Sequence, residues 1–382
     1  MSTHSTSDGH PGPPRGRRYD RTPLVVTWEV TQACALACDH CRADATPDRD
    51  PNELTTEEGI DLFEQVADFG DRPPMLVLSG GDPLERPDLP ALLEGASDAG
   101  LVPSVTPATT PSLDRETLAD LADAGVGRVA VSLDGATADR HDAFRGEEGT
   151  FDTALEAARA ARGLGLSIQV NTTVTARTAA DLPEIADLVE DLGAVMWEVF
   201  FLIPVGRGAE LEQLSPPEAA NVAAWLAERS REAPYRIITV EAPFFRRVSN
   251  ERRRARGEEP ATVGTTGAGN GFVFVSATGE VYPSGFMPTS AGNVREESLV
   301  SIYRDSPLMQ RLRDRTAFDG PCGTCPAAET CGGSRSRAFA ATGEPTGSDP
   351  LCPWVATDHE FDADEIDPDW VGRLAGPGRK SD

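Results

Sequence analysis

Two kinds of segment alternate along residues 24–203. Short runs rich in β-branched and aromatic residues are separated by longer stretches in which apolar positions recur at helical spacing. The strands we expect are Leu24–Val30, Met75–Leu78, Val102–Val105, Arg128–Ser132, Ile168–Thr173 and Trp197–Ile203. The helices we expect include Leu54–Phe69, Leu89–Ala99, Leu113–Asp123, Ala154–Leu164 and Leu182–Leu192. Six strand–helix units in succession predict an α/β protein with a parallel sheet and helices outside it, whose sites gather at the C-terminal ends of the strands.

The alternation stops after Ala233. Glu251–Pro260 is highly charged and is expected to be an exposed linker, and Thr262–Gly271 is rich in Gly and Thr. Phe272–Tyr282 predicts a hairpin that turns at Thr278-Gly279. A loop-rich segment with four cysteines follows, so the chain is expected to end in a second, smaller unit.

Charge narrows the functional classes. The net charge is −27, and Lys380 is the only lysine. An acidic surface of this kind stays soluble where salt screens its repulsion, which favours a halophilic source; the alternative is an ordinary acidic cytosolic enzyme. Nonspecific binding to nucleic acid is disfavoured because its phosphates would be repelled, so no nucleic-acid partner is expected.

The composition also bears on location. No long apolar run predicts a membrane span, and Met1–Arg21 lacks the apolar segment of a secretory signal. That N-terminal stretch is rich in Ser, Gly, Pro and Arg and is expected to be disordered. We therefore expect a cytoplasmic protein without a membrane partner.

The first cysteine group, Cys34-x3-Cys38-x2-Cys41, comes directly after the first predicted strand. Cubane 4Fe–4S clusters usually take four cysteines, so three thiolates leave one iron open to a further ligand. The alternative is a zinc site with His40 as a fourth ligand, but zinc favours paired CxxC or Cys/His spacing.

This spacing after a first strand resembles the signature of the radical S-adenosylmethionine (SAM) superfamily. Ser79-Gly80-Gly81-Asp82-Pro83 resembles the family's GGEP-type loop, with Asp82 where Glu is commoner. In the family this loop contacts the amino group of SAM, and its glycines permit close backbone approach. The resemblance implies a partial (β/α)6 TIM-type barrel with a small C-terminal loop-rich iron–sulfur domain.

Further strand ends resemble SAM contacts. Ser132 and Asp134, in Val131–Gly135, match the segment that meets the carboxylate or ribose of SAM. Asn171 resembles a ribose contact, and His40 stands where the family has an aromatic residue against the adenine. The resemblance implies that SAM binds a cluster held by three cysteines and is cleaved to methionine and a 5′-deoxyadenosyl radical. Strand caps and turns are the structural alternatives for these residues.

The second cysteine group consists of Cys322, Cys325, Cys331 and Cys352. Four thiolates complete an auxiliary 4Fe–4S cluster, and structural zinc is the alternative. The region resembles the SPASM domain, which binds two auxiliary clusters. Ser284 and Arg335 stand where that family has cysteines, so the ligands of one cluster are missing. The segment therefore resembles a reduced, single-cluster SPASM or "twitch" variant.

These resemblances set the expected domain boundaries. Residues 1–22 are a disordered tail, 23–235 the radical SAM core, 236–270 a connecting segment, 271–356 the SPASM/twitch-like domain and 357–382 an acidic C-terminal tail.

Two stretches, Arg140–Gly146 and Cys331–Ala338, resemble the branch that acts on haem precursors. The resemblance implies radical modification of a carboxylated tetrapyrrole side chain, such as oxidative decarboxylation of a propionate. Arginine suits bidentate carboxylate recognition, and Arg145, Arg207, Arg246 and Arg247 are candidates, with structural ion pairing as the alternative. Two other functions stay open, a maturase of a short peptide and a non-catalytic iron–sulfur electron carrier. An electron donor such as ferredoxin or flavodoxin is expected.

Overall fold

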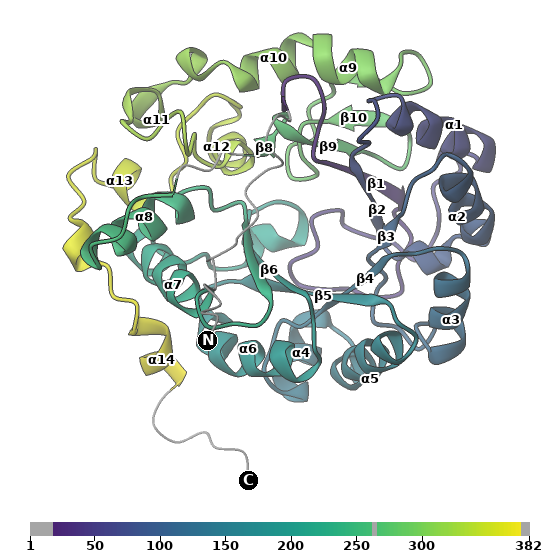
Figure 1. Cartoon of the computed structure of the whole chain (residues 1–382), viewed down its shortest axis with the longest axis horizontal. Helices are drawn as coiled ribbons and strands as arrows, with labels where there is room; N and C mark the ends of the chain where they lie inside the picture. The colour runs from purple at the N-terminus through teal and green to yellow at the C-terminus, as the bar shows by residue number, and fades with distance from the viewer. Residues whose placement is uncertain (1–17, 262–265, 376–382) are drawn as a thin grey trace, which may run out of the picture.

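The structure is a computed structural model that describes residues 18–261 and 266–375. Seven parallel strands follow one another in space: β1 (Val25–Thr31), β2 (Met75–Gly80), β3 (Ser104–Val105), β4 (Arg128–Ser132), β5 (Ser167–Val174), β6 (Met196–Phe201) and β7 (Arg236–Val240). The connecting helices are α1 (Thr56–Ala67), α2 (Leu89–Asp98), α3 (Arg115–Asp123), α4 (Ala138–Arg145), α5 (Thr150–Gly163), α6 (Leu182–Asp191) and α7 (Pro216–Arg229). The strands form an arc with these helices outside it (Figure 1), which is the expected partial barrel.

One face of each strand packs against the helices. Trp28 on β1 is fully buried and meets the ring of Phe63 on α1 with centroids 5.6 Å apart. Trp197 on β6 is buried in the same way beneath Trp225 of α7. Because side chains alternate across a strand, the remaining positions point into the barrel.

The interior positions are more polar than the outer ones. On β5 the outward Ile168 and Val170 are buried in the apolar core, whereas Gln169 and Asn171 bond to each other inside the barrel at 2.8 Å. Glu198 on β6 also lies on this inner face. The interior therefore offers polar groups to a ligand, and one of them, Asn171, is a residue that the sequence singled out.

The barrel extends one strand beyond the expected six. β7 pairs in parallel with β6, and α8 (Phe245–Ala255) packs against α7. β7 and α8 both lie in the stretch 236–270 that was expected to be a connecting segment. The first five residues of the linker expected over Glu251–Pro260 are the last residues of α8. Arg252 and Arg256 of this part bind Glu228 of α7 at 3.0 and 2.6 Å, which explains why so charged a segment is helical.

The C-terminal part joins the same sheet at its other edge. β9 (Gly271–Val275) pairs in parallel with β1, β10 (Glu280–Tyr282) is antiparallel to β9, and β8 (Gly267–Ala268) and β11 (Gly292–Asn293) are short additions. The predicted hairpin and its turn are confirmed, with Gly279 at φ +87°. Helices α9 (Leu299–Asp305), α10 (Pro307–Arg313), α11 (Gly320–Thr324), α12 (Arg335–Thr342) and α13 (Pro353–Ala356) follow.

Both ends of the described chain pack on this body. Tyr303 on α9 donates to the carbonyl of Tyr19, and Arg313 on α10 donates to that of Asp20 at 3.2 Å. Residues 18–22 are thus held in place, contrary to the disordered tail expected over 1–22; residues 1–17 lie outside the described residues. At the other end, α14 (Trp370–Ala375) packs on α6 and α7 and buries Val371 completely.

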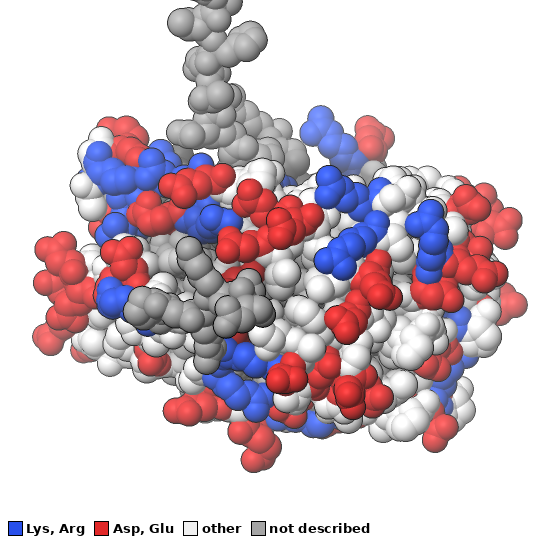
Figure 2. All heavy atoms as spheres, turned by 90° about the horizontal axis from the view of Figure 1, so that it is seen from below, with Lys and Arg blue, Asp and Glu red and all other residues white. Residues whose placement is uncertain are grey.

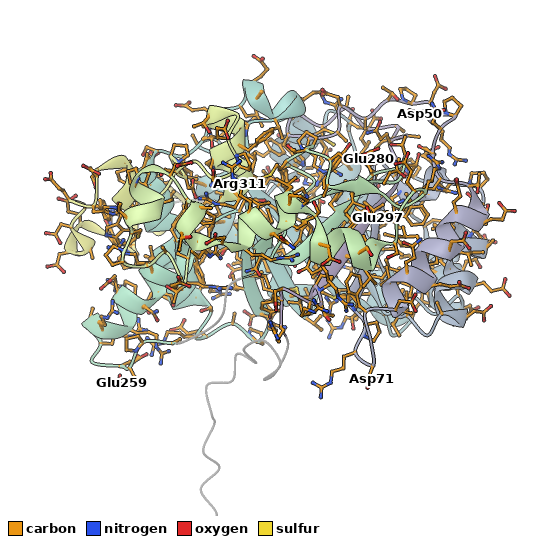
Figure 3. All side chains as sticks on the ribbon, turned by 90° about the horizontal axis from the view of Figure 1, so that it is seen from above. Asp50, Asp71, Glu259, Glu280, Glu297 and Arg311 are labelled. Carbon is orange, nitrogen blue, oxygen red and sulfur yellow. The ribbon has the colours of Figure 1, made fainter. Side chains whose placement is uncertain are left out.

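Acidic side chains cover much of the surface. Figure 2 shows red and blue groups interspersed over one face, with acidic groups prominent along its edges. Asp71, Glu259 and Glu297 are exposed, and Asp71 and Glu259 lie at the lower edge of the molecule in Figure 3. In the described part of the chain, no helix is long and apolar enough to cross a membrane.

Candidate active site

A cavity of about 210 Å³ opens where strands β1–β6 end. Its walls combine residues from all six strand ends and one residue, Phe286, from the C-terminal part. They include every one of the first three cysteines, which we call the primary cysteines: Cys34, Cys38 and Cys41. Of the SAM-contact candidates they include His40, Gly80, Gly81, Ser132, Asp134 and Asn171. The sequence-predicted residues, spread over 138 positions from 34 to 171, are therefore brought together here.

The loop that carries the primary cysteines is fixed by backbone hydrogen bonds. Cys34 N–H donates to the carbonyl of Thr46 at 2.8 Å, which closes the loop on itself. Asp39 N–H donates to the carbonyl of Phe144 on α4 at 3.0 Å. Cys34 and Cys38 are buried, and burial raises the pKa of Cys34 to about 11. Such thiols lose their protons readily only to a metal cation.

The glycine loop after β2 packs directly on the cysteine loop. Gly81 N–H donates to the carbonyl of Thr31 at 2.8 Å, and Asp82 N–H donates to that of Ala33 at 2.7 Å. A Cβ on Gly81 would lie 2.2 Å from the Ala33 oxygen, and one on Gly80 would lie 2.2 Å from the Thr31 oxygen. Because these glycines have no side chain, the glycine loop lies close to the start of the cysteine loop, and the same glycines line the cavity.

Asp82 does not line the cavity. Its carboxylate is fully buried and accepts hydrogen bonds from Leu84 N–H at 3.1 Å and Ala108 N–H at 3.2 Å. Burial raises its pKa to about 6, against these hydrogen bonds. The Asp82 side chain thus joins the glycine loop to the loop after β3. The preceding residues Gly80 and Gly81, and not Asp82, line the cavity.

Asp134 and Arg145 form a buried ion pair beside a primary cysteine. The two side chains meet at 2.7 Å, and Arg145 also donates to Cys38 Sγ at 3.6 Å. Burial alone would raise the pKa of Asp134, but the Arg145 guanidinium and the nearby imidazoles outweigh it and lower that pKa. Arg145 thereby places a fixed positive charge next to a thiolate ligand of the first site.

The stretch Arg140–Gly146 supports this site in several ways. His141 accepts from Asp134 N–H at 3.1 Å, and Asp142 caps α5 by accepting from Phe151 N–H at 2.8 Å. Phe144 stacks on His40 with centroids 4.7 Å apart and planes at 10°. Burial lowers the pKa of His40 to about 4, so its ring is neutral above that pH and suited to lie against an apolar face.

One wall of the cavity is apolar and carries arginine. Phe200, Phe201, Leu202 and Ile203 from the end of β6 form it together with Phe286. Arg207 borders it, with Nε donating to the carbonyl of Cys38 at 2.9 Å; its buried Nη2 has no hydrogen-bond partner among the described residues. Of the other carboxylate-binding candidates, Arg145 lines the cavity, whereas Arg246 and Arg247 do not.

Sequence reasoning missed Arg42 and Phe286 in the cavity. Arg42 binds Glu29 of β1 at 2.8 Å and lies over the Phe274 ring, 4.5 Å from its centre. Its place directly after Cys41 was an available signal. No pattern marked Phe286, whose backbone N–H donates to Ser284 Oγ at 3.2 Å.

The second site contains the remaining four cysteines, which we call the auxiliary cysteines: Cys322, Cys325, Cys331 and Cys352. They come from α11, the loop after it and the start of α13, and they interact electrostatically with one another. Burial raises the pKa of Cys331 to about 12 and that of Cys352 further. All seven cysteines are free thiols.

The surroundings of the auxiliary cysteines fit an iron–sulfur cluster. Backbone N–H groups of Ala327, Gly333 and Asp349 donate to the sulfurs of Cys325, Cys331 and Cys322 at 3.4, 3.5 and 3.4 Å. Hydrogen bonds to sulfur are one means by which proteins stabilise such clusters. At the first site, Leu36 N–H donates to Cys34 Sγ at 3.3 Å in the same way.

Within residues 18–261 and 266–375, no three His, Cys, Asp or Glu side chains gather as ligands of one ion would. In a cubane each thiolate binds a different iron, so the cysteines surround the cluster instead of meeting at one point.

Ser284 and Arg335, which replace expected cysteines, have other partners. Ser284 Oγ donates to Glu241 Oε1 at 3.3 Å, and Ser336 Oγ donates to the same oxygen at 2.7 Å. Arg335 donates to the carbonyl of Gly347 at 2.6 Å. The positions of the missing ligands are thus occupied by a hydrogen-bonded network that joins the barrel end to α12.

Comparison with known proteins settles the family. Residues 28–189 match the radical SAM superfamily, and residues 267–326 match the SPASM iron–sulfur cluster-binding domain. The chain belongs to the radical SAM superfamily. It is 37% identical to the AdoMet-dependent heme synthase of Methanosarcina barkeri, over 86% of this chain and 96% of that one. The corresponding enzyme of Nitratidesulfovibrio vulgaris is 34% identical over 92% and 97% of the two chains.

Other relatives of this radical SAM enzyme widen the range. The Fe-coproporphyrin III synthase of M. barkeri is 32% identical over 87% of this chain and 88% of that one. Among solved structures, SuiB of Streptococcus suis bound to SAM superposes with a TM-score of 0.69 at 16% identity, covering 87% of this chain and 77% of SuiB. The predicted fold, enzyme class, cofactors (SAM and 4Fe–4S clusters) and haem-biosynthesis branch are confirmed.

Proposed function

We propose that this radical SAM enzyme oxidatively decarboxylates propionate side chains of a carboxylated tetrapyrrole. The observation that supports this most is the composition of the cavity. One part combines the primary cysteines with polar strand ends, and the other offers an apolar wall bordered by arginine. A tetrapyrrole has the matching combination of a flat apolar ring and anionic side chains, and relatives over nearly their full length are named haem synthases.

The lining of the cavity supports an assignment for the first cluster and SAM, and the second cysteine group supports one for the auxiliary cluster. We assign the primary cysteines to the SAM-binding cluster and the auxiliary cysteines to a fully ligated cluster. SAM would contact Gly80, Gly81, Ser132 and Asn171, with its adenine against His40. Bound there, SAM supplies the 5′-deoxyadenosyl radical that abstracts hydrogen. Asp134 acts by holding Arg145 beside Cys38, and Asp82 by holding the glycine loop.

The substrate would occupy the apolar side. Phe200, Ile203 and Phe286 offer surfaces for a ring face, and burial of that face excludes water from the radical. Arg207 has one guanidinium nitrogen without a partner in the described structure, and a propionate carboxylate would satisfy it. The position of Arg207 beside the apolar wall is therefore suited to bind one propionate carboxylate at the edge of a flat tetrapyrrole ring.

The electron balance requires an acceptor. A propionate that loses one hydrogen atom and CO₂ leaves a vinyl group and one electron, so each cycle must remove that electron. The auxiliary site is suited to this role because four thiolates leave no iron open to substrate. A small one-electron carrier such as ferredoxin or flavodoxin would supply the electron that starts each cycle.

The acidic surface and domain boundaries complete the proposal. We infer a halophilic source and a cytoplasmic location. The radical SAM core would cover residues 23–235, and its barrel would be extended by β7 and α8 of the connecting segment 236–270. The SPASM/twitch-like unit would cover residues 271–356. The acidic C-terminal segment would cover residues 357–382, within which α14 packs on α6 and α7. Unfolding temperatures that rise between low and molar KCl would support the halophilic part; no change would oppose it.

One product analysis tests the activity. Anaerobically reconstituted enzyme is given SAM, a strong reductant and Fe-coproporphyrin III, and products are followed by mass spectrometry. We expect 5′-deoxyadenosine together with tetrapyrroles that carry vinyl groups in place of propionates. SAM cleavage without any change to the tetrapyrrole would contradict the proposal and direct attention to peptide substrates. Absence of SAM cleavage under all reducing conditions would favour an electron carrier.

A further inference from the structure

Four arginines surround the auxiliary cysteines, and we call them the arginine cage: Arg246, Arg247, Arg315 and Arg335. Two come from the start of α8, one from the turn after α10 and one from the first position of α12. They converge from three separate segments in a chain whose net charge is −27. Such a concentration of positive charge around one site requires an explanation.

Two of the cage arginines, Arg247 and Arg335, lie close to sulfur atoms of the auxiliary cysteines. Arg247 Nη1 lies 3.7 Å from Cys325 Sγ, and its guanidinium stacks over Trp354, 3.9 Å from the ring centre. Arg335 is 3% exposed, and its Nη2 lies 2.7 Å from the point where a Cβ on Gly333 would stand. Cys322 Sγ and Asp349 Cβ each lie 2.9 Å from that same point, so the guanidinium shares this small space with the sulfur and with an aspartate side chain.

The other two are close as well. Arg315 Nη1 lies 2.3 Å from the point where a Cβ on Gly332 would stand, beside Cys331, and its guanidinium lies 5.1 Å from the Phe318 ring centre. Arg335 lies 4.3 Å from the same ring, so one aromatic side chain positions both. Arg246 interacts electrostatically with Cys331.

One buried carboxylate acts on the same cysteines. Asp349 is fully buried, its negative charge acts on Cys331 and Cys352, and its side chain pairs with Arg337 at 3.3 Å. Glu329 is exposed and acts on Arg315 only at a distance. Among the described residues, no carboxylate lies within salt-bridge distance of Arg247, Arg315 or Arg335. By formal charge, the four arginines outnumber the carboxylates Asp349 and Glu329 near the auxiliary cysteines, of which Cys322 and Cys352 are buried.

A cubane with four thiolates is negatively charged, and reduction adds one more negative charge. Positive charges nearby favour the reduced form more than the oxidised form, and shielding from solvent strengthens their effect. We propose that the arginine cage raises the reduction potential of a cluster held by the auxiliary cysteines, so that its oxidised form takes the electron released by substrate oxidation. The inference rests on the proposed function, since it needs a cluster at this site. The cluster gains one electron in this step and returns it to a one-electron carrier.

The experiment measures that potential directly. Redox titrations followed by EPR use the full chain with Cys34, Cys38 and Cys41 replaced by Ala, which leaves only the auxiliary cluster, and the complete enzyme for comparison. In Arg247→Gln and Arg315→Gln, we expect the one-electron reduction equilibrium to fall about tenfold, which corresponds to about 59 mV. Arg247→Lys, which retains the charge, should recover most of the shift.

Arg254→Gln is the matched control, since Arg254 lies on α8, is 53% exposed and pairs with Glu251 at 2.7 Å. It should leave the potential unchanged. Potentials that stay at the starting value in both Gln variants, with four irons retained, would overturn the inference. Zinc in place of iron at this site would overturn both the inference and the auxiliary part of the proposed function. A shifted potential in an enzyme that leaves tetrapyrroles unmodified would support the cage and refute only the substrate.

Discussion

Gly81 lies against the backbone of Ala33, the residue before the first cluster cysteine. A Cβ on Gly81 would stand 2.2 Å from the Ala33 carbonyl oxygen, and the next amide, from Asp82, donates to that oxygen at 2.7 Å. The loop assigned to SAM and the loop assigned to the cluster are therefore one packed unit. Sequence reasoning treats the glycine loop as a ligand contact alone, and predicts that a side chain there would weaken SAM binding while both clusters remain.

The structure changes that expectation for Gly81→Val. A β-branched side chain cannot fit without moving the cysteine loop, so we expect loss of the SAM-binding cluster as well as of SAM affinity. Iron per reconstituted chain should fall from about eight to about four. Gly372→Val is the control, because a Cβ there meets nothing within 4 Å. Full iron content with weakened SAM binding would show that the loop yields and that the contact is to SAM only.

The primary cysteines can be separated from the auxiliary ones by iron analysis. Replacing Cys34, Cys38 and Cys41 by Ala should leave about four irons and abolish SAM cleavage. The auxiliary pair of substitutions described next serves as its reciprocal control, since it removes the other four irons. Any SAM cleavage by the primary variant above background would contradict the central assignment.

Cys325→Ala with Cys352→Ala tests the auxiliary site. We expect this variant to bind SAM and to cleave it when given a strong reductant, because the primary cavity contains neither residue. It should fail to complete substrate turnover, since the released electron has no acceptor. A purely structural site would instead unfold the C-terminal part, seen by circular dichroism and by rapid proteolysis after about Arg254. Normal turnover in a well-folded variant would exclude both roles.

The buried pair of Asp134 and Arg145 gives a stability prediction. Asp134→Asn removes the partner of a buried guanidinium beside Cys38 and should destabilise the protein by about 3–5 kcal/mol. Adding Arg145→Met removes the unpaired charge and should restore part of that loss, although cluster loading should stay reduced. Asp139→Asn, on the exposed side of α4, is the control. The free energy of unfolding is measured anaerobically. A value for Asp134→Asn equal to those of the wild type and of Asp139→Asn would contradict the ion-pair role.

The strand–helix alternation predicted six strands and most helices because their apolar stripes are distinct. α7 was not predicted: its stripe is built largely from alanine, which contrasts little with its surroundings, yet Ala219, Ala220 and Ala223 are fully buried. The sequence predicts an exposed linker over the second half of α8 because that stretch is highly charged. Its arginines are paired with carboxylates on another helix, such as Glu228 of α7, which lies 24 residues before Arg252. Long-range pairing of this kind leaves no local pattern.

The site divides in the same way. Motif spacing identified the seven cysteines and the strand-end polar residues, because a cluster and SAM demand fixed residue types at fixed intervals. Phe286 was not identifiable because it reaches the cavity only when the C-terminal part folds against the barrel. The arginine cage was not identifiable because it forms only when α8, the turn after α10 and α12 come together. Asp82 shows the converse: its motif position is right for the loop, but its side chain faces inward.

Glu198 gives the last prediction, on pH. This carboxyl lies inside the barrel on β6, where burial raises its pKa to about 7 against the attraction of Arg128 and Arg236. Below pH 4.5 the group is protonated in both the folded and the unfolded chain. As pH rises from 4.5 to 7, the unfolded chain ionises while the folded one keeps its proton, so the group progressively destabilises the folded state, by at most about 3 kcal/mol above pH 7.

Glu198→Gln removes this dependence. Anaerobic thermal unfolding should therefore show a small difference from wild type at pH 5.5 and a higher Tm for the variant at pH 8. Glu156→Gln, on the exposed face of α5, should show no such change between the two pH values. If Glu198→Gln differed from wild type by the same amount at both pH values, the carboxyl would not be held protonated in the folded barrel.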